Sequence, residues 1–253
     1  MVSVSLTVYF EPIENLQASH LSSLREQWKG NYPNLAELPP LRPRNRGGNE
    51  AALFPIASWP CPYVMFSTED DQESIAIQSD RFIRSWSFQA DETESVTYPG
   101  FEQIRADLVE HFDEFKETVQ AELDHDVVVT GSECDYINSL DDDLSPEQLM
   151  VGLTTKWSTA VNVSESPALT YGGVRLHLCN DPDLQGCSVT LRLDADREDG
   201  PMLGITSSFD LAENEDASIA IELGGLDRAH ERLIETFLEY TSDEMHKKWG
   251  KQA

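Results

Sequence analysis

The chain has 253 residues, 40% of them hydrophobic and 9% aromatic, a composition typical of a folded globular protein rather than a disordered one. Forty-six acidic residues against 18 basic residues leave a formal net charge of −28. Because so negative a field repels phosphate backbones, we do not expect the general surface to bind nucleic acid.

The acidity of the chain has three explanations. Only six of the 18 bases are lysines, and a lysine-poor, acid-rich surface is typical of a halophile that must stay hydrated in high salt. A high net charge also keeps any protein soluble. The third explanation is functional: an acidic face docks a basic protein partner or mimics a nucleic acid. Composition alone leaves all three open.

The first predicted elements are a strand and a short helix. Apolar residues alternate over Ser3–Phe10, which predicts a half-buried strand. Leu21, Leu24 and Trp28 then recur at helical spacing and indicate a helix over residues 16–28.

The segment 39–50 is loop by composition. It gathers three bases, which either contact a partner or pair with acids of the chain's own surface: Arg42, Arg44 and Arg46.

The stretch "QSDRFIRSWSF", residues 78–88, belongs to a predicted strand over Ser74–Phe88 that follows a strand starting at Tyr63. Ile75 and Ile77, just before the stretch, are odd-numbered, whereas the aromatic residues within it are even-numbered. Because side chains of a strand alternate, the apolar face must change near residues 79–80, by a bulge or a swap of covering layers. We expect the aromatic residues to turn inward: Phe82, Trp86 and Phe88.

Two long amphipathic helices are predicted. One carries the apolar stripe Ile104, Leu108, Phe112, Phe115 and Val119, and the other, after Gly224–Gly225, carries Leu226, Leu233, Phe237, Met245 and Trp249. Strands are predicted in the second half at Met150–Val163, Val174–Leu178, Ser188–Leu193, Met202–Phe209 and Ser218–Leu223.

These elements predict an α+β fold, mainly antiparallel sheet covered by two long amphipathic helices, with a shorter N-terminal helix. The acidic connector 141–148 is the predicted internal boundary. It divides an N-terminal α+β half, 1–140, from a C-terminal β-rich half, 141–253, within one compact unit. Each half runs through strands to a long helix, which suggests two β–α halves.

The candidate binding residues each have a structural alternative. Asp80 and Arg81 suit a buried or rim ion pair that fixes the register of the hairpin formed by the two predicted strands, whereas Arg81 and Arg84, on opposite strand faces, would offer a fork to an anionic ligand. Trp86 suits the core or a recognition platform. His230 falls on the apolar stripe of the last helix, where it is either a core histidine or a ligand contact.

No motif predicts a reaction. The sequence lacks a P-loop, a nucleophile elbow and the paired histidines of a zinc site, so we predict no catalytic residue, no metal ligand and no cofactor. The cysteines do not have metal-ligand spacing, and Cys179 and Cys187 flank a turn that leaves a disulfide open. Cys134 lies between Glu133 and Asp135, and these acids should raise the pKa of its thiol.

The chain is predicted to be cytoplasmic. Its N-terminus lacks the basic start of a signal peptide, and no apolar run approaches the roughly 18–20 residues of a membrane span.

Four motifs carry a resemblance to a known family. They are "Q-x-D-R-F-x-x-W" at 78–86 (with one residue more before the tryptophan), "YPGFE" at 98–102, "YIN" at 136–138 and "H-x-x-WG" at 246–250. With them the chain resembles a sporadically distributed prokaryotic family of uncharacterised proteins. The resemblance implies a shared fold and no activity. Such a scattered distribution is typical of accessory genes, including defence and toxin–antitoxin genes.

Three functional hypotheses follow. The first is a non-catalytic interaction protein, of antitoxin, immunity or defence-accessory type, whose acidic surface neutralises a basic protein. The second is a sensor that binds a small ligand in a cavity between sheet and helices. The third is an enzyme of unrecognised type. The sequence does not indicate an oligomeric state.

Overall fold

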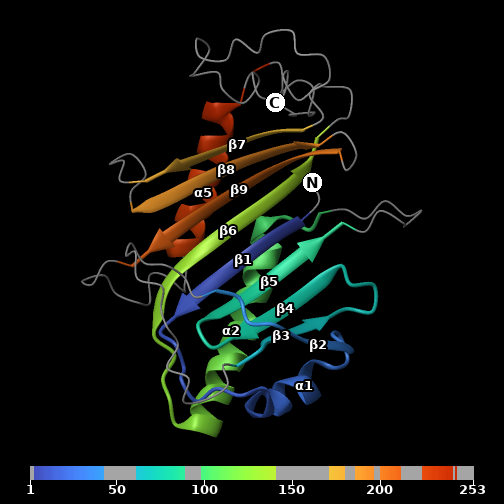
Figure 1. The fold of residues 1–253 in the computed structure, drawn as a ribbon. Coiled ribbons are helices and arrows are strands. Elements are labelled where there is room, and N and C mark those ends of the chain that lie inside the picture. Colours follow the sequence, from blue (N-terminus) through green and yellow to red (C-terminus); the bar gives the residue numbers. More distant parts are fainter. Residues whose placement is uncertain are drawn as a thin grey trace.

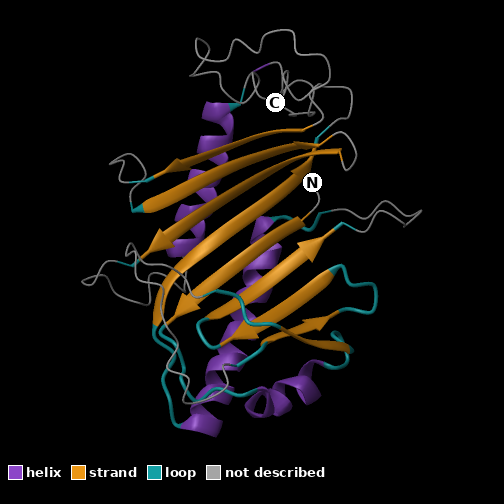
Figure 2. Cartoon of the chain, in the orientation of Figure 1, coloured by secondary structure: helices purple, strands orange, loops and turns teal. Residues whose placement is uncertain are grey.

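The computed structural model describes residues 3–42, 61–88, 98–140, 171–179, 186–196, 200–211, 224–241 and 243. It has an α+β fold built on one antiparallel sheet of nine strands, in the order β2-β3-β4-β5-β1-β6-β9-β8-β7. The long helices α2 and α5 run behind this sheet in Figure 1, and Figure 2 shows the same separation of helix and strand. The described helices include none with the length and apolar character needed to cross a membrane.

The strands are β1 (Ser3–Phe10), β2 (Asn34–Leu38), β3 (Tyr63–Ser67), β4 (Glu73–Gln78), β5 (Arg81–Ser87), β6 (Val129–Ser139), β7 (Tyr171–Leu178), β8 (Cys187–Asp196) and β9 (Gly200–Asp210). The helices of the described residues are the 3-10 turn η1 (Ala18–Leu21), α1 (Ser22–Trp28), α2 (Phe101–Leu123) and α5 (Gly224–Tyr240).

The order of elements repeats on the two sides of the sheet centre. Strands β1 and β6 lie side by side there; on their other sides β1 pairs with β5 and β6 pairs with β9. Strand β5 precedes α2 and β9 precedes α5, and in both cases 13 residues, 88–100 and 211–223, separate strand from helix. The helices meet near their N-termini, where Arg105 of α2 forms an ion pair with Asp227 of α5 at 2.8 Å.

The core lies between the sheet and the helices. The alternate residues Val4, Leu6 and Val8 of β1 are completely buried, because that side of the pleat faces α2. The predicted stripe of α2 is buried at all five positions: Ile104, Leu108, Phe112, Phe115 and Val119. The ring of Phe82 lies 5.4 Å from that of Phe112 and 5.6 Å from that of Phe115, so sheet and helix interdigitate through aromatic rings.

The single strand predicted over Ser74–Phe88 is wrong, because the segment forms the hairpin of β4 and β5. Gln78 pairs with Arg81, which leaves Ser79 and Asp80 as a two-residue turn. In this register Ile77 faces Phe82, so an odd-numbered residue of one strand lies on the same side as an even-numbered residue of the next. The change of parity therefore comes from reversal of the chain, and neither a bulge nor a swap of covering layers is needed.

Phe88 is the second correction. It was expected to turn inward with Trp86, but it follows the end of β5 and is 42% exposed, whereas Trp86 is buried. Strand β2, at the edge of the sheet, has only five residues and was not predicted. Several predicted features lie outside the described residues: the strands Met150–Val163 and Ser218–Leu223, the connector 141–148, and Met245 and Trp249.

Candidate functional site

Arg81 lies in a structural ion pair. Its Nε and Nη2 each donate to a different carboxylate oxygen of Asp80 at 2.9 Å, and both residues are buried. Burial opposes the charged form of Arg81, but the hydrogen bond and the charge of Asp80, together with Tyr9 and Glu133, outweigh it and raise the pKa of the guanidinium. The ion pair holds the β4–β5 turn, which the sequence did not predict.

The same turn fixes the start of the loop 39–50 that carries the three arginines. Gln78 accepts a hydrogen bond from the backbone N–H of Leu41 at 2.7 Å and donates to its carbonyl oxygen at 3.1 Å. Arg81 donates to the carbonyl oxygen of Arg42 at 2.6 Å. Arg42 therefore takes part through its backbone, and its side chain is exposed. Arg44 and Arg46 lie outside the described residues.

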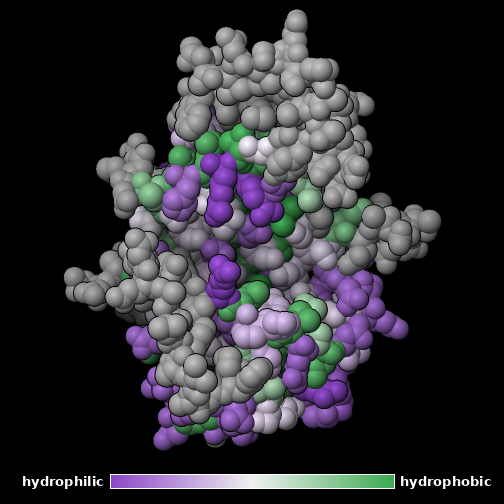
Figure 3. Space-filling model, viewed as in Figure 1, coloured by the Kyte–Doolittle hydropathy of each residue, from purple (hydrophilic) through white to green (hydrophobic). Residues whose placement is uncertain are grey.

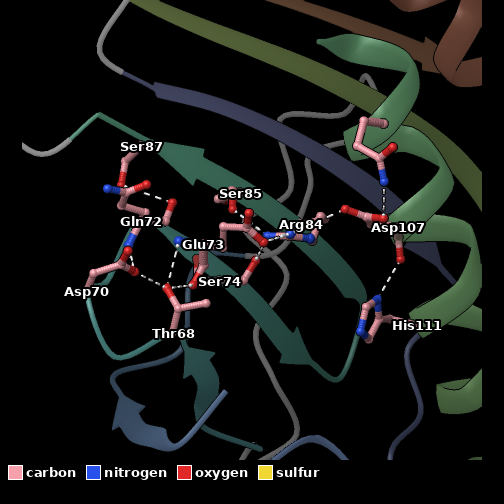
Figure 4. A network of polar contacts seen from close by, with 11 residues as sticks. Thr68, Asp70, Gln72, Glu73, Ser74, Arg84, Ser85, Ser87, Asp107 and His111 are labelled. Carbon is pink, nitrogen blue, oxygen red and sulfur yellow. Dashed lines mark hydrogen bonds and ion pairs between the residues drawn. The ribbon is translucent and has the colours of Figure 1, made fainter. Parts of the chain in front are cut away.

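Arg84 points to the opposite side of β5 and is 1% exposed. Figure 4 shows its guanidinium between the β3–β4 turn and α2. It forms an ion pair with Glu73, lies 3.6 Å from a carboxylate oxygen of Asp107, and donates to the carbonyl oxygen of Ser85 at 2.8 Å. Arg84 thus ties the hairpin to the helix, and it does not combine with Arg81 in a ligand site.

Trp86 and His230 lie on the helix side of the sheet. Trp86 packs edge-on against Tyr98, with ring centroids 5.4 Å apart. His230 stacks on Phe101 with centroids 3.8 Å apart, which brings α5 against the start of α2. Burial lowers the pKa of the His230 imidazole, against the opposing effect of Glu102 and Asp227. Stacking of the partly buried His230 ring on Phe101 of α2 fits a role in packing the two helices.

The open face of the sheet carries a hollow that the sequence did not predict. It has a volume of about 310 Å³. Four strands contribute to its lining: Glu133, Asp135 and Ile137 of β6, Gly204, Thr206 and Ser208 of β9, Ser188, Thr190 and Arg192 of β8, and Arg175 and His177 of β7. Leu176, Leu191 and Cys134 on the same strands are buried on the helix side, so the pleat directs their polar neighbours outward.

The carboxylates on one side of the hollow belong to Glu133 and Asp135. Glu133 accepts hydrogen bonds from Tyr9 at 3.1 Å and from Ser208 at 2.6 Å, and Asp135 accepts one from Thr206. Burial raises the pKa of the Asp135 carboxyl, and neighbouring Glu133 adds to this, while Thr206 and Arg192 oppose it. The two acids therefore form a fixed wall of hydrogen-bond acceptors.

The bases lie across the hollow. Arg175 and Arg192 are directly opposite each other in the β7–β8 pairing, and both are exposed. Arg192 forms an ion pair with Asp194 at 2.8 Å. The Nδ1 atom of His177 lies 2.9 Å from the hydroxyl of Thr190. Figure 3 shows strongly hydrophilic side chains over strands β7 to β9 on this face.

Charge is distributed unevenly over the molecule. The lining of the hollow holds two carboxylates and two guanidiniums, so it is balanced in a chain of net charge −28. Three of the four arginines on described strands point to the open face, namely Arg81, Arg175 and Arg192. The exposed side of α2 is acidic instead, with Glu102, Glu110, Asp113, Glu117 and Glu122.

Comparison with known proteins finds no family model, no curated protein and no solved structure that matches this chain. The resemblance based on the four motifs therefore stays a prediction.

Three of the cysteines, Cys61, Cys134 and Cys187, have the character of structural thiols because they are buried. Cys179 and Cys187 do not form the disulfide that the sequence left open. Burial raises the pKa of the Cys134 thiol well above its usual value, and Glu133 adds to the effect. Burial also raises the pKa of Cys61 and of Cys187 to about 11. The described residues include no group of three or more His, Cys, Asp or Glu placed to hold a metal ion.

Proposed function

We propose that this chain is a non-catalytic interaction protein and that the open face of its sheet is the binding surface. The observation that carries the proposal is the hollow between β6 and β7, where residues from four strands bring carboxylates, guanidiniums and hydroxyls together. An antiparallel sheet can simply expose one polar face to water. A balanced set of opposite charges gathered in one hollow supports recognition beyond solvation.

The chemistry of the described side chains favours binding over catalysis. The thiols of Cys61, Cys134 and Cys187 have raised pKa values, which makes them poor nucleophiles. Glu133 and Asp135 each accept hydrogen bonds from neighbouring side chains, and these bonds fix both carboxylates as a recognition wall would require.

The partner that fits best is a basic protein. The acidic field of the chain would steer it, and the acids and bases of the open face would set its orientation. This agrees with an antitoxin, immunity or defence-accessory role in a prokaryotic cytoplasm, as the family resemblance suggests.

Affinity purification from the native host tests the proposal with two matched variants. Glu133→Gln with Asp135→Asn removes two charges from the open face, and Glu110→Gln with Glu117→Gln removes two from the outer side of α2. We expect the open-face variant to bind the partner about ten-fold more weakly and the helix variant to bind as the wild type does. Binding of the wild type should also weaken with salt.

Two results would contradict this assignment. If the helix variant alone lost the partner, the acidic side of α2 would be the docking surface. If purification at low salt recovered no partner from the host, the interaction hypothesis would fail. Melting temperatures of both variants, measured in parallel, show whether either change acts through folding.

A small-ligand sensor is the second candidate. A hollow of about 210 Å³ lies between the η1–α1 segment and the edge strand β2 with its neighbour β3. Its lining is mixed, with apolar Leu21, Leu35, Val64 and Phe66 beside charged Arg25 and Glu37. Convergence of a few charged groups on an apolar pocket is the usual character of a small-molecule site. A thermal-shift screen of metabolites against the purified chain would test this alternative.

A further inference from the structure

We infer that the hollow of the open face binds a zwitterion, with an oxyanion at the Arg175–Arg192 end and an ammonium group at the Glu133–Asp135 end. The inference rests on the proposed function in placing recognition on the open face, and it names the chemistry that is recognised there.

The oxyanion end is defined by the two opposed arginines. Like charges directly opposite each other destabilise a strand pair, so Arg175 beside Arg192 has a cost that an anion between them would remove. Asp194 engages Nε of Arg192, and among the described residues none forms an ion pair with Arg175. A guanidinium fork matches the geometry of a carboxylate or a phosphate. His177, two residues along β7 on the same face, adds a third nitrogen-bearing group.

The floor of the hollow leaves room for the ligand at this end. Gly204 of β9 pairs with Arg192 of β8 on one side and with Ile137 of β6 on the other. Because glycine has no side chain, β9 leaves the space between Arg192 and Ile137 open. A Cβ atom added to Gly204 would meet its nearest neighbour, the Arg192 carbonyl oxygen, at 3.9 Å, which is ordinary contact. A larger residue at 204 should therefore fill the hollow without straining the strand.

The carboxylates of Glu133 and Asp135, on the opposite side of the hollow, recognise the ammonium end of the ligand. Glu133 and Asp135 receive hydroxyl donors from the strands around them, and a cationic group would complete their coordination. An entirely anionic ligand would be repelled by this wall. Strands β6 and β8 are separated by β9 alone, so their backbones lie about 10 Å apart, two sheet spacings. Asp135 lies level with Thr190, two residues along β8 from Arg192, so the diagonal between the two backbone positions is about 12 Å. The side chains of Asp135 and Arg192 shorten this span, and a linear ω-amino acid about 10 Å long would reach from base to acid.

Calorimetric titration with 8-aminooctanoate, beside octanoate as the probe without an ammonium group, tests the inference. The wild-type chain should bind 8-aminooctanoate about ten-fold more tightly than octanoate, since one charged hydrogen-bonded contact is added. Arg175→Gln should weaken binding by about ten-fold for the same reason. Gly204→Val should abolish it by filling the floor, with every charge retained.

Arg232→Gln is the matched control, because it removes one guanidinium from α5 on the covered side of the sheet and should bind like the wild type. Equal binding of the two probes, wild-type binding by the Gly204→Val variant, or no binding to the wild-type chain would each overturn the inference. The Gly204→Val variant keeps the test valid if Arg175→Gln fails to fold.

Competition between 8-aminooctanoate and the co-purified partner shows where the zwitterion comes from. If 8-aminooctanoate displaces the partner, the ligand is a pair of acidic and basic side chains on that protein. If it binds without displacing the partner, the ligand is a free small molecule, and the zwitterion site stands while the protein-docking proposal fails. If the open-face variant (Glu133→Gln with Asp135→Asn) loses the partner but the wild type does not bind 8-aminooctanoate, the protein-docking proposal stands and the zwitterion site fails.

Discussion

Replacing Arg84 with alanine should lower the free energy of unfolding by about 3–5 kcal/mol. Arg84 is 1% exposed and is the group that joins Glu73 of the hairpin to Asp107 of α2. The change removes the guanidinium from between two carboxylates and leaves a cavity under the sheet. Arg84→Met should recover part of the loss, because methionine refills the volume but not the charge. Urea denaturation of the three proteins measures these differences.

Lys116→Ala is the matched control for Arg84. Lys116 pairs with Asp113 on the surface of α2 at 2.6 Å, and an exposed pair of this kind contributes less than about 1 kcal/mol. If Arg84→Ala cost no more than this control, the buried network of Figure 4 would not hold the hairpin to the helix.

Phe82→Ala should destabilise the chain by about 3–5 kcal/mol, the usual cost of removing a buried aromatic side chain. Phe82 is completely buried, and its ring contacts Trp28 as well as Phe112 and Phe115. Its loss would open a cavity where β5, α1 and α2 meet. Thermal and urea unfolding of the variant give the change in stability.

Phe88→Ala removes the same chemical group six residues later, from a side chain that is 42% exposed. We expect it to cost less than about 1 kcal/mol. Similar losses for both phenylalanines would contradict the packing of the sheet against α2, because only one of the two rings lies inside it.

Alternation of apolar residues predicted the strands well where one face is buried and the other is polar. Ser3–Phe10 coincides with β1, and β8 and β9 extend the predicted ranges by one to three residues at each end. The pattern succeeds there because a shift of one residue would expose the whole apolar set. It missed β2, which is a short edge strand with little buried surface.

The β4–β5 turn was missed for a different reason. Ser79 and Asp80 have no glycine or asparagine to mark a two-residue hairpin loop, and Asp80 is held by Arg81 instead. The parity change between Ile77 and Phe82 was the available signal, and it fits a reversal of the chain as well as it fits a bulge.

The hollow could not be located from the sequence because strand order decides which residues meet. Glu133 and His177 are 44 positions apart, and β9 and β8 lie between their strands. The sequence contained only a local signal. Charged residues occupy alternate positions of β6 and β7, on the side of each strand opposite to the buried residues. This pattern shows which side chains face away from the core. It does not show which strands are neighbours, because strand order is a property of the tertiary structure.

Oxidative footprinting of the complex recovered from the host tests most directly that the open face is the binding surface. Met202 lies on that face of β9, two residues from Gly204, and is 36% exposed. Its thioether should be oxidised readily in the free chain and protected in the complex, whereas Leu238 on α5 and Phe88 should react equally in both. Protection of Leu238 with unchanged oxidation of Met202 would place the partner on the helix side and contradict the account.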